Sequence, residues 1–201
     1  MAVSRKERAA ATRRRMMSAA CHVFSTRGYA ATTMDAVATE ADVAVQTLYF
    51  TFHTKAELLQ AAYEYAVLGP EQTPPHLSQW WREVESAEDV RTAVERLVDG
   101  SLPILERAAP LVWVIRADED ARATYEHNET LRRAGNEILV QRLAQKHPLR
   151  PGLSVAQACD ILLAFTGPHQ HELFIKEFRW PKEEFRDWVV HAILRELFGM
   201  T

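Results

Sequence analysis

The sequence predicts an all-α protein, built from a small N-terminal unit and a larger helical body. Only 7 glycines and 9 prolines occur in 201 residues, and their clustering leaves long segments free to form helices. Apolar residues recur every three or four positions, as at Met16, Ala20, Val23 and Phe24. No stretch alternates convincingly with the two-residue period of a strand. A sheet protein is therefore not expected.

Helix boundaries follow from capping residues and helix breakers. Gly28 should end the first helix and Thr32 should cap the second, while residues 54–57 and 154–157 form capping boxes. Gly167 and Pro168 should break the helix that begins near residue 154, because proline has no amide hydrogen to donate. The expected helices cover about residues 5–26, 33–40, 44–50, 55–67, 77–85, 87–106, 110–117, 118–147, 154–178 and 182–198.

The best candidate linker lies at Gly69-Pro70 and Pro74-Pro75, where two helix-breaking pairs follow each other closely. It predicts an N-terminal domain of residues 1–68 and a second domain of residues 69–201. Hydrophobic residues make up 47% and charged residues 25%, which is ordinary globular usage and excludes a disordered chain. With two cysteines, no signal-peptide pattern and no apolar run near 20 residues, we expect a cytoplasmic protein with no membrane partner.

The charge of the chain is distributed unevenly. Residues 1–60 carry eight basic and five acidic side chains, so the rest of the chain has a net charge of −6. The first fifteen residues hold six basic groups against one acid. A basic end on an acidic body is typical of a protein that binds a polyanion, and a solvated tail is the alternative.

Residues 33–52 carry the most informative pattern. Two short helices meet at the three-residue segment Ala41–Val43, which is the spacing of a helix-turn-helix. Ala36, Val37, Val43 and Leu48 are the apolar contacts that would fix the angle between the two helices. In this motif the second helix enters the major groove of DNA.

Side chains around the second helix are the candidate DNA contacts. Gln46 can hydrogen-bond base edges and Thr47 can reach bases or phosphate, whereas Tyr49, His53 and Lys55 suit phosphate. Tyr49 could instead pack in the core and His53 could be an ordinary surface residue. The predicted set is Arg13, Arg14, Thr32, Thr33, Val45, Gln46, Thr47, Tyr49, Phe50, His53 and Lys55.

The segment from about residue 12 to residue 60 resembles the DNA-binding domain of the TetR family of bacterial transcriptional repressors. The resemblance is carried, without gaps, by Phe24, Gly28, Tyr29, Thr32, Thr33, Met34, Val37, Ala38, Ala41, Val43, Thr47, Leu48, Tyr49, Phe52, Lys55, Leu58 and Leu59. It implies a homodimer whose three N-terminal helices bind DNA and whose divergent body binds a ligand. Asp42 stands where the family usually has glycine, and Ala44 stands where serine usually caps the recognition helix, so Asp42 could substitute as the cap.

The helical body offers only candidate ligand contacts. Aromatic walls with few charges would suit an organic effector of middle size, and Arg116 leaves room for an anionic one. Each residue by itself could instead belong to the core or to the surface. The set is Trp113, Arg116, Tyr125, His127, Phe165, His169 and Phe174.

No cofactor, metal or catalytic set is expected. His169 and His171 are two residues apart, so on a helix they point to different faces and do not chelate one ion. No nucleophile stands beside a base in a recognisable motif, and Cys21 and Cys159 should be buried and inert.

The sequence therefore predicts a ligand-responsive transcriptional repressor that binds a palindromic operator as a homodimer. The alternatives are an all-α enzyme with an incidental helix-turn-helix and a DNA-binding module without a ligand. The two C-terminal helices should form the dimer, because the last helix, with Trp188 among its apolar residues, is apolar around more of its circumference than a surface helix needs.

Overall fold

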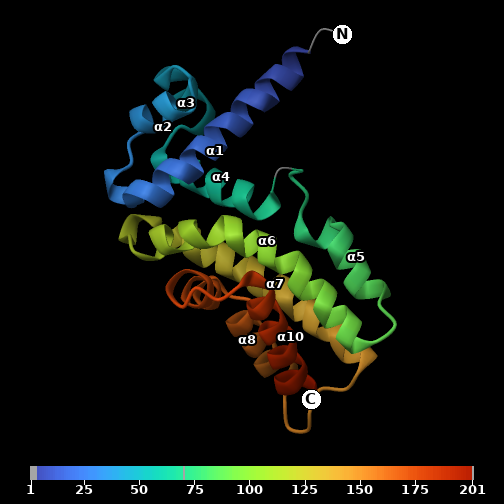
Figure 1. Cartoon of the computed structure of the whole chain (residues 1–201). Coiled ribbons are helices and arrows are strands. Elements are labelled where there is room, and N and C mark those ends of the chain that lie inside the picture. Colours follow the sequence, from blue (N-terminus) through green and yellow to red (C-terminus); the bar gives the residue numbers. More distant parts are fainter. Residues whose placement is uncertain (1–3, 70, 201) are drawn as a thin grey trace. The chain divides into compact units, whose positions relative to one another are not determined.

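A computed structural model of the chain describes residues 4–69 and 71–200, and in this part of the chain all regular structure is helical, as predicted (Figure 1). The chain divides into two compact units. One unit runs to Gln72 and adds Pro110–Glu126; the other comprises Thr73–Ala109 and the chain from His127 onward. No helix in the described ranges is long and apolar enough to cross a lipid bilayer.

Four helices make up most of the first unit: α1 (Arg5–Ala31), α2 (Met34–Glu40), α3 (Val45–Phe52) and α4 (Lys55–Leu68). α1 packs against α2 and α4, and α3 packs against the same two helices. Phe24, Val37, Leu48, Leu58 and Leu59 are fully buried and form the centre of this unit. The two short helices α2 and α3 are therefore held by a core to which all four helices contribute.

Two threonines precede α2, and the second of them is its cap. The cap is Thr33, whose hydroxyl accepts a hydrogen bond from the amide of Ala36 at 3.1 Å. Thr32 is buried instead, and its hydroxyl donates to the carbonyl of Gly28 at 2.6 Å. The prediction of Thr32 as the cap was wrong by one residue, because Thr32 closes the end of α1 and α2 begins only at Met34.

The turn between α2 and α3 tolerates both departures from the family pattern. Asp42 adopts a φ of 52°, the left-handed conformation that short polar residues accept most easily after glycine. Ala44 occupies the N-cap of α3 without any side-chain hydrogen bond. Asp42 does not substitute as the cap; its carboxylate lies 3.9 Å from the guanidinium of Arg15.

The second unit is built from α5 (Gln79–Ser86), most of α6 (Val90–Arg116) and α7 (Arg122–Lys146), α8 (Val155–Phe165), α9 (Pro168–His171), η3 (Glu172–Glu177) and α10 (Lys182–Phe198). The short 3₁₀ helices η1 (Pro75–Leu77) and η2 (Glu119–Ala121) precede α5 and α7, and η2 belongs to the first unit. One core joins residues of α5, α6, α7, α8 and α10, among them Leu97, Leu143, Leu162 and Ile193. α8 and α10 pack directly against each other.

Helix α6 is continuous where the sequence predicted two helices. Pro103 and Pro110 both lie inside it. A proline in a helix removes one backbone hydrogen bond and crowds the preceding turn. Buried side chains continue along the helix through Leu105, Leu111 and Ile115, and their packing outweighs this local cost.

The compact units also differ from the predicted division at residue 68. Residues 110–126, comprising the end of α6, η2 and the start of α7, belong with the N-terminal helices. Within this unit Asp118 and Asp120 lie close enough to Tyr29 to raise the pKa of its phenol, although burial of the ring is the larger cause. Local sequence signals could not show this, because residues 110–126 and the N-terminal helices are far apart along the chain.

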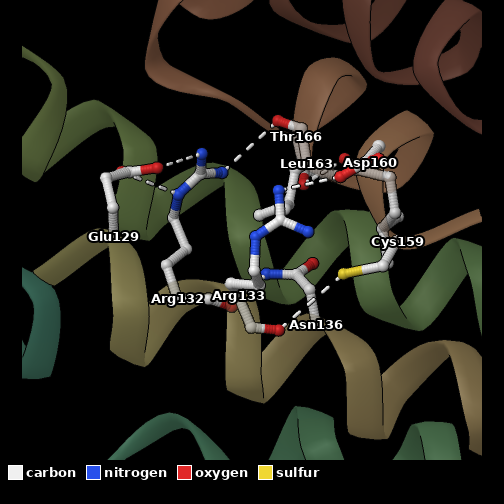
Figure 2. Close-up of polar contacts among 9 residues, drawn as sticks. Glu129, Arg132, Arg133, Asn136, Cys159, Asp160, Leu163 and Thr166 are labelled. Atoms are coloured by element: carbon white, nitrogen blue, oxygen red, sulfur yellow. Dashed lines mark hydrogen bonds and ion pairs between the residues drawn. The ribbon is translucent and has the colours of Figure 1, made fainter. Parts of the chain in front are cut away.

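The helix that begins after residue 154 is broken as predicted, and groups of the protein donate hydrogen bonds to carbonyls just before the break. α8 ends at Phe165, and both the amide and the hydroxyl of Thr166 donate to the carbonyl of Leu162, at 2.9 and 2.7 Å. The guanidinium of Arg132 on α7 donates to the carbonyl of Leu163 at 3.3 Å (Figure 2). The carbonyls of Leu162 and Leu163 are therefore both hydrogen-bonded within the chain.

Position 167 requires glycine, because the backbone here lies very close to the carbonyl of Leu163. A Cβ atom on this residue would lie 2.7 Å from the carbonyl oxygen of Leu163. We predict that Gly167→Ala lowers the free energy of unfolding by about 1–3 kcal/mol, the range typical of overpacking. Urea denaturation followed by circular dichroism measures this change.

The matched control is Gly135→Ala in α7, where nothing lies within 4 Å of the added Cβ. It should stabilise the protein by about 0.5–1 kcal/mol, because alanine is the better residue inside a helix. Equal effects of the two substitutions would show that the contact at Leu163 does not constrain position 167.

Candidate nucleic-acid interface

Helix α3 has one buried face and one exposed face. Leu48 and Phe52 are 0% and 2% exposed and anchor the helix in the core of its unit. With 3.6 residues per turn, Gln46, Thr47 and Phe50 point away from these anchors, and all three are exposed. Phe50 is 85% exposed and Tyr49, at the side of this face, is 48% exposed. Val45 is half-buried, so its side chain is shared between the core and the edge of the exposed face.

The basic start of α1 is tied to the same region. The guanidinium of Arg13 lies 4.6 Å from the centre of the Phe52 ring, a cation–π distance. Two residues on, Arg15 approaches Asp42 in the turn before α3. Arg14 lies between them in the chain and is exposed. The contacts of Arg13 and Arg15 place positive charge next to the helix that would face DNA.

The side chain of Lys55 makes contacts within the N-terminal domain. Its ammonium donates to the carbonyl of Tyr29 at 2.9 Å and lies 4.2 Å from the centre of that ring. The side chain therefore joins the start of α4 to the end of α1, where Gly28 has interrupted the helical hydrogen bonds. Lys55 therefore has a positioning role, and its predicted phosphate contact stays a prediction, because a half-buried ammonium has further hydrogens to donate.

The remaining predicted contacts fall into two groups. Thr33 and His53 are exposed, at the start of α2 and directly after α3. Thr32 is 1% exposed and bonded to Gly28, so we assign it a structural role and remove it from the predicted DNA contacts. The other exposed positions stay predictions for DNA contact.

The described residues of this unit thus form a helix-turn-helix with an exposed second helix. A family model described as bacterial regulatory proteins of the tetR family matches residues 16–62, which span most of α1 and all of α2 and α3. The N-terminal domain belongs to the tetR family. Proteins of this family are DNA-binding transcriptional regulators, and the family assignment from the sequence is confirmed.

Solved structures of transcriptional regulators share the fold over nearly the whole chain. A putative regulator from Mesorhizobium loti is 21% identical with a TM-score of 0.71, over 95% of this chain and 98% of its own. FadR from Bacillus subtilis, solved in complex with stearoyl-CoA, is 14% identical with a TM-score of 0.72, over 90% of this chain and 97% of its own. NalD, the secondary repressor of the MexAB-OprM multidrug efflux pump in Pseudomonas aeruginosa, is 19% identical with a TM-score of 0.69, over 96% and 98%. No curated protein matches the chain.

The candidate effector contacts are distributed over both units. In the first unit Arg116 lies 5.6 Å from the Trp113 ring and 5.5 Å from the Tyr125 ring, so these three predicted residues are together. Tyr125 is half-buried, and His127, just beyond the first unit, is exposed. A guanidinium near two aromatic rings can bind the carboxylate of an organic anion while the rings contact its apolar part.

Phe165 and Phe174 belong to an aromatic cluster of the second unit. The Phe174 and Trp188 rings stack at 4.5 Å, and the Phe165 ring meets Trp188 edge-on at 5.6 Å. Trp180 and Phe185 complete the cluster, at 4.8 and 5.5 Å from Phe174. His169, also predicted, is exposed. Because these rings fill space against one another, Phe165 and Phe174 serve the packing of α8, η3 and α10.

The apolar side chains around α10 are already buried within the chain. Phe185, Val189, Ile193, Leu194 and Leu197 are each 0–1% exposed. Trp188 is half-buried in the aromatic cluster. The argument that this helix holds a surplus of apolar residues for a dimer was therefore wrong, because the folded chain itself covers them.

Two buried polar atoms lie next to this cluster. The Nδ1 of His171 and the Oε2 of Glu172 are buried without a hydrogen-bond partner in the structure, at the junction of α9 and η3. Among the described residues no group of three His, Cys, Asp or Glu side chains is placed to hold a metal ion. In the sequence, this pair could have been recognised as two polar residues that follow a helix break within a segment rich in aromatic residues.

His171 should make stability depend on pH. Burial lowers the pKa of its imidazole, and the neighbouring Lys176 and Lys182 act in the same direction against Glu106. The unfolded chain therefore binds a proton more readily than the folded chain, so stability rises as the pH increases through the interval just below the ordinary pKa of histidine and falls on acidification. We expect His171→Phe to flatten the dependence of the free energy of unfolding on pH between about 5 and 7.

The control for this measurement is His191→Phe, which changes an exposed histidine on α10. It should leave the slope against pH as it is in the unmodified protein. The same slope in all three proteins would exclude His171 as the source of the dependence.

Proposed function

We propose that this transcriptional regulator is a repressor that binds a palindromic operator as a homodimer and responds to a small organic effector. The observation that carries the proposal is the exposed face of α3, with Gln46, Thr47 and Phe50 turned away from a core that fixes the helix. A recognition helix in the major groove needs this combination of a rigid base and a free face.

Charge supports DNA as the partner. Six basic groups lie in the first fifteen residues, and the chain as a whole has a net charge of −3. The basic segment leads directly into the part of α1 that contacts α3 through Arg13. Such an arrangement attracts a polyanion to one end of an otherwise acidic protein.

The effector we propose is an organic molecule with an apolar body and an acidic group. Arg116 with Trp113 and Tyr125 offers one charged, aromatic contact, while His127, Phe165, His169 and Phe174 remain candidates of lower weight. Among the structures with this fold, FadR was solved with stearoyl-CoA, which combines an acyl chain with phosphates. We expect no tightly bound cofactor.

A catalytic role is the weaker alternative. Burial raises the pKa of the Cys21 thiol to about 12, so its nucleophilic thiolate is scarcely populated at neutral pH. Cys159 is buried and its thiol pKa is also raised by burial. We therefore infer a non-enzymatic regulator that acts on DNA in the cytoplasm of a bacterium.

The dimer surface we propose lies on α7. Leu131 and Ile138 are 58% and 45% exposed, and their spacing of seven residues places them on one face of the helix. A second copy of the chain could cover this face by two-fold symmetry, because in such an interface each protomer offers the same patch.

Gln46 should discriminate the operator from other DNA. We predict that Gln46→Ala lowers this discrimination by about 1–3 kcal/mol, the value of a bidentate contact between a side chain and a base. Fluorescence anisotropy with a selected operator and a scrambled duplex measures both affinities. Gln79→Ala, at an exposed position of α5, is the control and should change neither. Unaltered discrimination in Gln46→Ala would remove Gln46 from base recognition.

The basic residues of α1 should act without regard to sequence. The double variant Arg8→Gln/Arg14→Gln should lower the affinity for the operator and for scrambled DNA to similar extents. It should also reduce the slope of log affinity against log salt by about 1 for each phosphate that the variant no longer neutralises. Arg195→Gln on α10 serves as the control. A slope equal to that of the unmodified protein would show that the basic segment is only a solvated tail.

The oligomeric state tests the dimer. Sedimentation velocity at micromolar concentration should give a dimer for the unmodified chain and a monomer for Leu131→Glu/Ile138→Glu. Leu77→Glu, at a position 55% exposed in η1, should remain dimeric. A stable monomer of the unmodified chain would overturn the homodimer, whereas a dimeric double variant would move the interface away from α7.

A further inference from the structure

Phe50 is the most exposed large apolar side chain in the described part of the protein. It is 85% exposed, compared with 58% for Leu131 and 56% for Phe178. Single exposed apolar residues are common and need no explanation by themselves. The position of Phe50 is what makes it informative, because it lies on the free face of α3.

Folding gives no reason for an aromatic residue at this position. The contacts that hold α3 are made by Leu48 and Phe52 on the opposite face, and Phe52 is further covered by the guanidinium of Arg13. The exposed ring of Phe50 buries little surface within the chain. The phenyl ring is therefore available to a partner that meets α3 from outside.

The chemistry of the ring limits what that partner can offer. Phenylalanine has no hydrogen-bond donor or acceptor, so it cannot bond to phosphate oxygens or to the polar edges of bases. The major groove of DNA presents one apolar group, the 5-methyl of thymine, and an aromatic side chain can cover it. We propose that Phe50 selects thymine at one position in each half of the operator by contact with its 5-methyl group.

Gln46 predicts which base lies near this thymine in the half-site. It lies four residues before Phe50, so the two side chains share a face and are about 6 Å apart along the helix axis. A glutamine amide pairs best with adenine in the major groove. The expected half-site therefore contains an adenine and the selected thymine within about two base-pair steps, since successive pairs are about 3.4 Å apart.

This inference rests on the proposed function, so the test begins with DNA binding itself. The full chain is used to select duplexes from a random library, and each thymine of the selected site is then replaced by uracil. Uracil pairs as thymine does and lacks only the methyl group. Covering one methyl group corresponds to about a fourfold change in affinity. We expect one uracil position in each half-site to weaken binding about fourfold.

The protein variants connect this effect to the ring. Phe50→Ala should bind the operator more weakly and lose the response to uracil at that position, whereas Phe50→Leu should keep part of both. Leu77→Ala, at a second exposed apolar position, should retain the full response. Thermal melting checks that all variants fold, which is expected because Phe50 contributes little to the core.

The outcomes separate the two proposals. Failure to enrich any sequence would overturn the proposed function itself. An enriched operator with no uracil-sensitive position, or one equally uracil-sensitive in Phe50→Ala, would overturn the role of Phe50 while operator binding stands. A Phe50→Ala protein that binds and responds as before but sediments differently would assign the ring to contact between protein copies, which also overturns the proposal.

Discussion

The burial of Leu48 and Phe52 in the N-terminal core is the interaction on which the candidate interface depends. These two side chains lie one turn apart on α3, and the core that receives them is shared by α1, α2 and α4. A helix of eight residues is too short to be stable by itself. Its conformation and its exposed face therefore exist only because tertiary packing holds one side of it.

Several weaker contacts refine this arrangement. Arg13 covers the outer side of the Phe52 ring, and Lys55 ties α4 to the end of α1 at Tyr29. Thr33 supplies the first turn of α2 with a hydrogen-bond acceptor, whereas Ala44 leaves α3 without one. The start of the recognition helix is thus fixed by packing and by the turn at Asp42, and a cap is not needed.

In the second unit, hydrogen bonds stabilise the point where α8 ends before Gly167. At Gly167 the backbone passes close to the carbonyl of Leu163, to which Arg132 donates a hydrogen bond, and Thr166 donates to the carbonyl of Leu162. Arg132 is itself held by Glu129 through two hydrogen bonds of 2.9 and 3.1 Å (Figure 2). The neighbouring Arg133 pairs with Asp160 on α8 at 2.8 Å, so α7 and α8 are joined at two neighbouring positions before the break.

The sequence by itself determined the helical class, the position of the helix-turn-helix and the break at Gly167-Pro168. These features follow from local signals, namely apolar periodicity, glycine, proline and capping residues, which act within a few positions of the chain. Tertiary structure decided whether α6 runs through Pro103 and Pro110, because a continuous buried face outweighs a local cost. It also decided that Thr32 faces inward, that Lys55 bonds to the carbonyl of Tyr29 and that the apolar side chains of α10 are covered by the chain's own core. Those outcomes depend on partners distant in sequence, whose positions no local pattern records.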